Sequence, residues 1–210
     1  METRLEYVTV ERMLRCALAG GEDAEPQEIW FLLHGYGQLA DDFLDSCSVL
    51  AAPGRLLVAP EAPSRFYLEG GRGRIGASWM TSREREREVS DYVRALDAVH
   101  ARLVPGDSAA HVSVLGFSQG GATACRWATL GSARVDRVIT WAGGVPEDLS
   151  LERLSERELV CVVGSRDRYI DEARLQREEE RLAAVPHRLL RFEGGHRVDE
   201  ALLRSLAEGS

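Results

Sequence analysis

Residues 112–122, which read VSVLGFSQGGA, constrain the fold of this chain more than any other stretch. Their first half is apolar and of strand length, as expected for a strand that is buried on both faces. The run ends at Ser118, which follows Gly116 closely and comes just before Gly120 and Gly121. Glycine loses more conformational entropy on folding than any other residue. The turn at this serine must therefore require a geometry or a close packing that side chains would prevent.

Similar apolar runs recur along the chain and alternate with segments of helical period. This alternation is typical of an α/β protein whose central sheet is mainly parallel. Residues 4–19 are expected to add one or two antiparallel strands at the edge of that sheet. The remaining strands are expected at residues 29–33, 56–59, 112–117, 138–142, 159–163 and 189–192.

The helices are expected between these strands. Apolar residues spaced three and four apart over residues 89–103 indicate an amphipathic helix. Thr81 and Glu84 have the spacing of a capping box at its start. Further helices are expected at residues 119–130, ended by Gly131, at residues 172–184 and at residues 198–206.

Composition argues against several classes of function. The net charge of −8 opposes binding to nucleic acid or to an anionic membrane. No apolar run approaches the roughly 18 residues that span a bilayer, and residues 1–14 lack the apolar core of a secretory signal, which favours a cytoplasmic protein. The four cysteines lack zinc-ligand spacing, so we expect no metal and interpret them as small buried hydrophobic residues. No linker divides the chain, and residues 1–210 are expected to form a single domain.

Residues 116–120 match the pattern G-x-S-x-G. With a strand directly before it and a helix directly after it, this pattern indicates a nucleophile elbow, a sharp turn that exposes the serine hydroxyl at the carboxyl edge of the sheet. The alternative is a glycine-rich nucleotide-binding turn, but the stretch lacks the G-x-G-x-x-G and G-K-[ST] patterns that hold phosphate. Ser118 is therefore the candidate nucleophile.

A serine hydroxyl needs a base to take its proton. Of the five histidines, His111 and His187 come just before strands, at the amino edge of the sheet, and His100 lies within a helix. His34 precedes the serine in the chain. His196 follows the last strand in a glycine-rich loop at the carboxyl edge, and it is the candidate base.

The acid that orients the base is expected between the serine and the histidine in chain order. Asp167 comes just after a strand, where the catalytic groups of open α/β sheets collect. Asp148, which follows the preceding strand, is the reserve candidate. Asp136 lies at the wrong edge, and Asp171 is expected to cap the next helix.

An anionic tetrahedral oxygen needs backbone N–H donors. The N–H of Gln119 adjoins the serine at a helix amino end. A second donor is expected from residues 34–38, HGYGQ, which follow the strand at residues 29–33, and Tyr36 is the expected donor residue there. His34 is interpreted as a residue that braces this loop.

Four motifs, LHGYGQ, GFSQGG, GSRD and GGH, occur in this order and resemble the phospholipase/carboxylesterase family of α/β-hydrolases over about residues 29–200. The resemblance implies an α/β-hydrolase fold with helices on both faces of the sheet. It also implies a triad of Ser118, Asp167 and His196, and water-mediated deacylation with no metal or cofactor. Trp79, in the sequence SWM, falls where the family often carries a tryptophan beside the acyl pocket.

The function expected from these residues is the hydrolysis of small-molecule carboxylic esters. A chain of 210 residues has no room for a large lid domain, which favours short to medium acyl chains. The connection at residues 61–80 exceeds ordinary loop lengths and is expected to be functional. Its aromatic residues Phe66, Tyr67 and Trp79 are candidates to line the acyl pocket, and its basic residues Arg65, Arg72 and Arg74 are candidates to meet an anionic substrate.

Several alternatives stay open. The chain could be an acyl-protein thioesterase, another thioesterase or a lysophospholipase. A dienelactone-type hydrolase is a further alternative, although those enzymes typically carry cysteine at the elbow, and Ser118 counts against it. The alternative outside catalysis is a ligand-binding protein on a hydrolase scaffold. Nothing in the sequence indicates a homo-oligomer.

Overall fold

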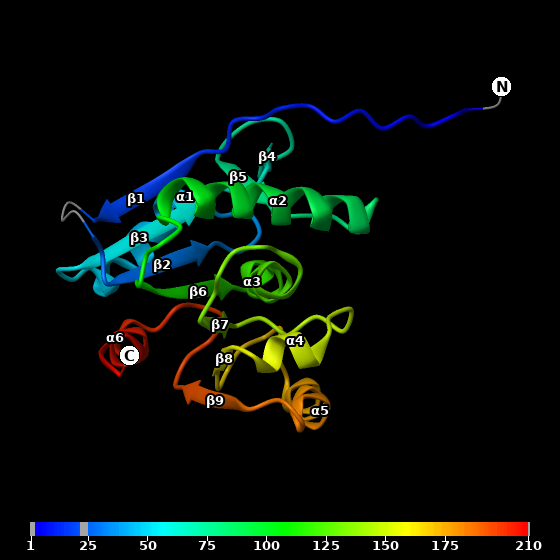
Figure 1. The fold of residues 1–210 in the computed structure, drawn as a ribbon. Coiled ribbons are helices and arrows are strands. Elements are labelled where there is room, and N and C mark those ends of the chain that lie inside the picture. Colours follow the sequence, from blue (N-terminus) through cyan, green and yellow to red (C-terminus); the bar gives the residue numbers. More distant parts are fainter. Residues whose placement is uncertain (1–2, 22–24, 210) are drawn as a thin grey trace.

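The computed structural model describes residues 3–21 and 25–209. They form a seven-stranded sheet in the order β1-β3-β2-β6-β7-β8-β9, in which only the edge strand β1 runs antiparallel to its neighbour (Figure 1). The strands of this sheet are β1 (Cys16–Gly20), β2 (Glu28–Leu33), β3 (Arg55–Pro60), β6 (His111–Phe117), β7 (Arg137–Trp141), β8 (Glu158–Gly164) and β9 (His187–Phe192). A separate antiparallel hairpin consists of β4 (Ser64–Tyr67) and β5 (Ile75–Ser78).

Helices cover both faces of the sheet, and α6 lies on the opposite side from α3 and α5 (Figure 1). This is the fold class expected from the sequence, an α/β-hydrolase fold. The helices are α1 (Ala40–Ser46), the short 3₁₀ helix η1 (Ser48–Leu50), α2 (Arg85–Leu103), α3 (Gln119–Leu130), α4 (Leu151–Ser155), α5 (Glu172–Leu182) and α6 (Glu200–Glu208).

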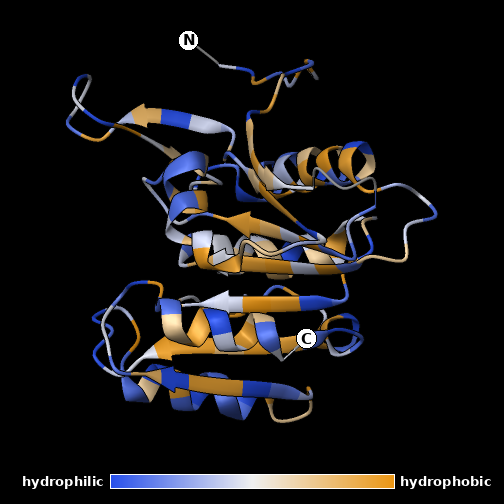
Figure 2. Ribbon diagram, turned by 90° about the vertical axis from the view of Figure 1, so that its left-hand side faces the viewer, coloured by the Kyte–Doolittle hydropathy of each residue, from blue (hydrophilic) through white to orange (hydrophobic). Residues whose placement is uncertain are grey.

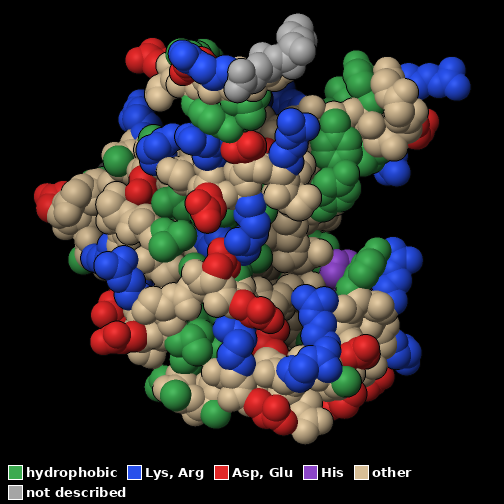
Figure 3. Space-filling model, turned by 90° about the vertical axis from the view of Figure 1, so that its right-hand side faces the viewer, with side chains coloured by type: hydrophobic (Ala, Val, Ile, Leu, Met, Phe, Trp, Pro, Cys, Tyr) green, Lys and Arg blue, Asp and Glu red, His purple; other side chains and the backbone are tan. Residues whose placement is uncertain are grey.

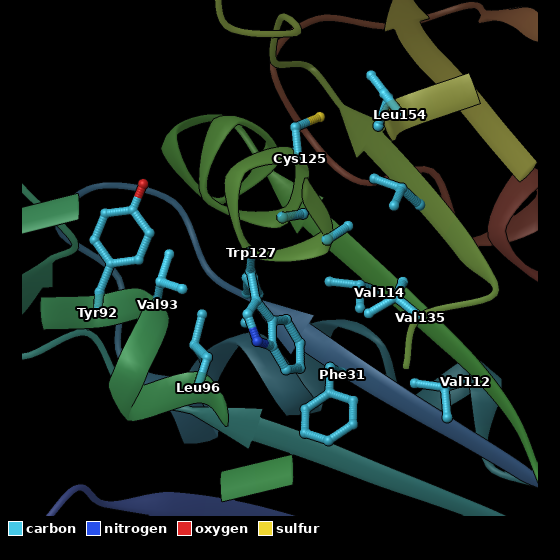
Figure 4. Close-up of a cluster of buried hydrophobic side chains, with 14 of the residues drawn as sticks. Phe31, Tyr92, Val93, Leu96, Val112, Val114, Cys125, Trp127, Val135 and Leu154 are labelled. Carbon is cyan, nitrogen blue, oxygen red and sulfur yellow. The ribbon is translucent and has the colours of Figure 1, made fainter. Parts of the chain in front are cut away.

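The alternation of side chains along each strand divides the apolar residues into two cores. In β2, Phe31 faces the core under α2 and α3, and Trp30 faces the core under α1 and α6. Figure 2 shows the strands mainly in hydrophobic colours and the helices in both colours, as expected of helices that bury one face. In the first core, the rings of Phe31 and Trp127 meet edge to face with centroids 4.9 Å apart (Figure 4).

The expected strands are all present, with ends that differ by one or two residues. Within residues 4–19 only the last part, in β1, forms an edge strand, and it pairs with β3. The sequence did not predict helices α1 and α4 or the hairpin of β4 and β5. These elements are short and carry no long apolar period. The single domain over residues 1–210 stays a prediction.

The predicted capping box is wrong. Helix α2 begins at Arg85, because Glu84 has φ 53°, in the left-handed region, and caps the helix without a side-chain hydrogen bond. The hydroxyl of Thr81 instead donates to Glu88, one turn into the helix, at 3.2 Å. The left-handed residue displaces the helix start by three residues, from an N-cap at Thr81 to one at Glu84.

Three of the four cysteines are buried, as expected, but Cys16 on the edge strand is only partly buried. Burial raises the pKa of the Cys47 thiol to about 12. None of the helices in the described part of the chain has the length and hydrophobicity needed to cross a bilayer. The cytoplasmic location stays a prediction.

The order of the strands sets where a site can form. From β2 the chain passes through α1 to β3 on one side, and from β6 it passes through α3 to β7 on the other side. Ligands of open α/β sheets bind at such a switch point, outside the carboxyl ends of the strands. Because β2 and β6 pair in parallel with Leu33 opposite Gly116, the segments that follow these two strands lie side by side at that edge.

Candidate active site

Ser118 stands in a strained turn between β6 and α3. Its backbone has φ 54° and ψ −114°, a conformation that a residue with a side chain rarely adopts. The turn is tight enough that a Cβ on Gly116 would lie 2.0 Å from the carbonyl oxygen of Gly120, and a Cβ on Gly120 would lie 2.0 Å from the carbonyl oxygen of Leu33. Glycine is therefore required at both positions by close backbone contact, which accounts for the glycines around the serine.

The three residues of the predicted triad come together. His196 Nε2 lies 3.0 Å from Ser118 Oγ, and His196 Nδ1 lies 2.8 Å from Asp167 Oδ2. The side chain of Asp167 is fully buried, and that of His196 is 19% exposed. With Nδ1–H donating to the carboxylate, Nε2 presents its lone pair to the serine hydroxyl. The three side chains are therefore in consecutive hydrogen-bond contact, as the predicted triad requires.

Two aromatic rings hold the imidazole of His196. The ring of Phe117 lies 4.9 Å from it, and the ring of Tyr169 meets it edge to face at 4.6 Å. Tyr169 also donates its backbone N–H to Asp167 Oδ1 at 2.8 Å. The imidazole is thus held by packing as well as by its hydrogen bonds.

The other aspartates have different partners. Burial opposes ionisation of Asp148, but hydrogen bonds from Arg126 and Arg85 outweigh it and hold the pKa of this carboxyl at about 2. Asp148, the reserve candidate, is therefore engaged by two arginines and does not meet His196. Asp171 caps α5 as expected, accepting from the N–H of Arg174.

Asp136 also lies where the sequence placed it, at the amino edge of the sheet. Its carboxylate accepts the N–H of Val112, close to the start of β6. It is therefore far along the strand from the carboxyl edge that carries Ser118.

The loop expected to supply an oxyanion donor lies against the serine. A Cβ on Gly35 would be 3.3 Å from the Cβ of Ser118, and the N–H of Gly35 donates to Gln38 Oε1 at 2.8 Å. Among the described residues, the N–H groups of Tyr36 and Gln119 have no protein acceptor. Both expected donors are therefore free to bind an oxygen.

His34 braces this loop, as expected. Its imidazole is buried, Nδ1–H donates to the carbonyl of Gly35 at 2.8 Å, and Nε2 accepts the N–H of Ala62 at 3.0 Å. Burial lowers the pKa of His34. The two hydrogen bonds select the neutral tautomer, and the side chain ties the loop to the chain just after β3.

The remaining histidines also lie where the sequence placed them. His111 and His187 begin β6 and β9 at the amino edge of the sheet. His100 is in α2, with its ring stacked on Phe31 at 5.9 Å. None of the three is near Ser118.

A cleft of about 710 Å³ opens beside the triad. Ser118 and His196 line it, together with the start of α3, residues 142–147 and one face of α5. Figure 3 shows this side of the molecule, with a histidine at the edge of a hollow and hydrophobic side chains gathered on the projecting segment above it. The triad is therefore open to a substrate from this side.

Trp79 does not line this cleft, contrary to the expectation for it. The side chain is only 1% exposed, and its indole N–H donates to the carbonyl of His34 at 2.8 Å. Phe66 and Tyr67 lie on β4, outside the lining of the cleft. The ring of Phe66 contacts that of Tyr36 in a tilted arrangement, with centroids 5.1 Å apart.

The arginines of the cleft differ from those expected. Arg65 bonds Glu61 at 2.5 Å, and neither Arg72 nor Arg74 lines the cleft. Instead, the basic lining comes from Arg126 in α3 and from three arginines of α5, Arg174, Arg177 and Arg181.

Sequence reasoning missed α5 as a wall of the cleft. Glu178 accepts the N–H of Val145 at 2.8 Å, and Arg174 donates to the carbonyl of Tyr169 at 2.9 Å. These bonds tie the helix to the segments around the serine. The signal was the spacing of Arg174, Glu178 and Arg181 at positions that share one helix face. Within the residues described, no three His, Cys, Asp or Glu side chains gather as metal ligands.

Comparison with solved structures agrees with this fold. An acyl-protein thioesterase 2 from Zea mays has a TM-score of 0.73 at 19% identity, covering 93% of this chain and 96% of that one. A carboxylesterase from Mesorhizobium loti has a TM-score of 0.73 at 18% identity, covering 94% and 95%. A carboxylesterase from Bacillus cereus has a TM-score of 0.71 at 13% identity, covering 94% and 93%. The fold and the arrangement at its switch point define an α/β-hydrolase.

The chain belongs to the dienelactone hydrolase family, whose model matches residues 26–197. The family match and the similar structures agree with the resemblance to the phospholipase/carboxylesterase family. They confirm the expected class of enzyme, a carboxylic ester hydrolase. No protein of curated function matches the sequence.

The family match corrects one step of the sequence analysis. Ser118 counts against a dienelactone-type hydrolase in the sequence analysis, yet the chain matches the dienelactone hydrolase family and carries this serine. A serine at position 118 is therefore compatible with membership of this family.

Replacing Gly120 with alanine tests the close contact at the elbow. The added Cβ would meet the carbonyl oxygen of Leu33, a backbone atom fixed in β2, so the strand and helix must separate. We expect the free energy of unfolding to fall by about 3 kcal/mol, as for overpacked cores, measured by urea denaturation. Gly106→Ala is the control, because its Cβ would have no neighbour within 4 Å. A Gly120→Ala protein as stable as the Gly106→Ala protein would contradict the contact.

Proposed function

We propose that this protein is a serine hydrolase that cleaves carboxylic esters of small molecules through an acyl-enzyme on Ser118. The observation that carries the proposal is the line of contacts from Ser118 Oγ to His196 Nε2 at 3.0 Å and from His196 Nδ1 to Asp167 Oδ2 at 2.8 Å. A serine hydroxyl is a poor nucleophile unless a base in hydrogen-bond contact accepts its proton.

In the acylation step, Ser118 Oγ attacks the ester carbonyl while its proton moves to His196 Nε2. The carboxylate of Asp167 holds the imidazole in the tautomer with hydrogen on Nδ1, and it stabilises the imidazolium that forms. When the tetrahedral intermediate collapses, the bond to the alcohol oxygen breaks, and Nε2–H supplies the proton that this oxygen needs. The acyl group remains on the serine.

In the deacylation step, water replaces the alcohol. His196 takes a proton from the water, whose oxygen attacks the acyl carbon, and returns a proton to Ser118 Oγ as the acid leaves. The N–H groups of Tyr36 and Gln119 are proposed to bind the oxyanion in both steps. Supporting this role, both N–H groups are without a protein acceptor in the described residues. Gln119 follows the serine directly, and Gly35, the neighbour of Tyr36, packs on the serine.

Short to medium acyl chains remain the proposed substrates. An apolar surface for them is formed by Tyr36, in the loop beside the serine, and Phe66 of β4, whose ring centroids lie 5.1 Å apart. Tyr36 is 62% exposed. Exposed apolar side chains next to a polar cleft suit an ester whose acyl group leaves the water.

A thioester substrate would follow the same steps, and the contacts around Ser118 do not favour an ester over a thioester.

The alternative of a non-catalytic ligand-binding protein makes a separate prediction. A hydrolase scaffold without activity would leave Ser118 unlabelled by a fluorophosphonate, because such probes react with activated serines.

Replacing Ser118 with alanine removes the proposed nucleophile. We expect the rate of p-nitrophenyl butyrate hydrolysis to fall by about 10⁴-fold or more, because triad members act as a unit. Ser90→Ala, at an exposed serine of α2, is the control and should keep the parent rate. If Ser118→Ala hydrolysed the ester as fast as the parent, the proposed function would be wrong.

Replacing Phe66 with alanine tests the apolar surface. Removing the ring that contacts Tyr36 should lower kcat/KM for the butyrate ester about fivefold more than for the acetate ester, since the loss scales with the apolar area that the acyl chain covers. Leu130→Ala, at a 51% exposed residue at the end of α3, serves as the control. Equal losses for the two esters would place the acyl chain elsewhere.

A further inference from the structure

Trp79 joins the two segments that carry the proposed oxyanion donors. Its indole Nε1–H donates to the carbonyl of His34 at 2.8 Å, at the base of the loop that contains Tyr36. Its backbone N–H donates to Gln119 Oε1 at 3.1 Å, on the residue that follows the nucleophile. One buried residue is therefore bonded to both halves of the site.

The side chain of Gln119 completes the connection. Its Oε1 accepts from the N–H of Trp79, and its Nε2 donates to the carbonyl of Met80 at 2.9 Å and to Ser78 Oγ at 3.2 Å. The amide thus accepts from one backbone group and donates to another within residues 78–80, as the backbone of a paired strand does. Any shift of this segment moves the residue that carries one of the two donors.

The same segment is bonded to the other loop. The N–H of Gly37 donates to the carbonyl of Ala77 at 2.9 Å, and the N–H of Ala77 donates to the carbonyl of Gln38 at 3.1 Å. Residues 77–80 therefore lie between the loop that follows β2 and the turn that follows β6. Each of those segments is anchored on its own strand, and residues 77–80 bond them to each other.

We propose that Trp79 is a positioning residue that sets the separation of the Tyr36 and Gln119 N–H groups. The inference rests on the proposed function. An oxyanion gains most from donors that are already at 2.7–3.1 Å when the charge forms, so a displacement of one loop relative to the other weakens binding of the transition state. Binding of the ester in its ground state depends much less on this separation.

Trp79→Phe tests the proposal, because it removes the indole N–H and keeps an aromatic ring among His34 and Tyr92. We expect kcat for p-nitrophenyl butyrate to fall about tenfold, a fraction of the loss that follows removal of a whole oxyanion donor. KM should change less than twofold. The affinity for a trifluoromethyl ketone, which forms an oxyanion with the serine, should fall by the same factor as kcat.

Trp127→Phe is the matched control. Trp127 is also fully buried, and its indole N–H makes one bond of the same length, 2.8 Å, but to Asp97 of α2. Figure 4 shows it pointing into the core toward Phe31. This variant should lose stability in thermal unfolding as Trp79→Phe does, and keep the kcat of the parent.

Gln119→Met removes the amide that bonds residues 78–80 and so tests the same connection. It replaces Trp79→Phe as the test if that variant does not fold. It should lower kcat with KM unchanged, and in the double variant the two losses should combine to less than their product, as for residues in one network. Full kcat in both single variants, or an equal loss of kcat in Trp127→Phe, would overturn the proposal. The proposed function itself is judged separately, by the loss of activity in Ser118→Ala.

Discussion

The contact of Gly120 with the carbonyl of Leu33 is the constraint on which the candidate site depends. It brings the start of α3 against the end of β2, and no residue with a Cβ fits there. The close approach makes the turn after β6 so sharp that Ser118 takes a positive φ. The same contact places the loop after β2 beside the serine, where Gly35 packs on it. Ser118 and the proposed oxyanion donors are therefore placed by one backbone contact.

The convergence of the three candidate residues could be predicted because each follows a buried strand that the sequence marks clearly. Ser118, Asp167 and His196 come after β6, β8 and β9, and parallel pairing brings the ends of these strands to one edge. The place of Trp79 could not be predicted in this way. It follows β5, in a hairpin outside the main sheet, and its burial depends on contacts with His34 and Gln119 from distant parts of the chain.

Charge separates two aspartates that the sequence places at the same edge. Asp148 is surrounded by Arg126 and Arg85, which arrive from α3 and α2, and its carboxylate is fully engaged. Asp167 accepts from His196 and from the N–H of Tyr169, and no arginine pairs with it among the described residues. The sequence alone favours Asp167 over Asp148 as the acid. Only the tertiary contacts show why the imidazole of His196 bonds Asp167 and not Asp148.

The contacts of Phe117 and Tyr169 with the imidazole of His196 have a kinetic consequence. A half-turn of the imidazole about its Cβ–Cγ bond would exchange a nitrogen for a carbon at both ends and interrupt proton transfer. Contact with two aromatic rings opposes that flip, and the hydrogen bonds at both nitrogens oppose it further. Under the proposed function, an arriving ester meets a base that already faces the hydroxyl, so turnover does not wait for a side-chain rotation.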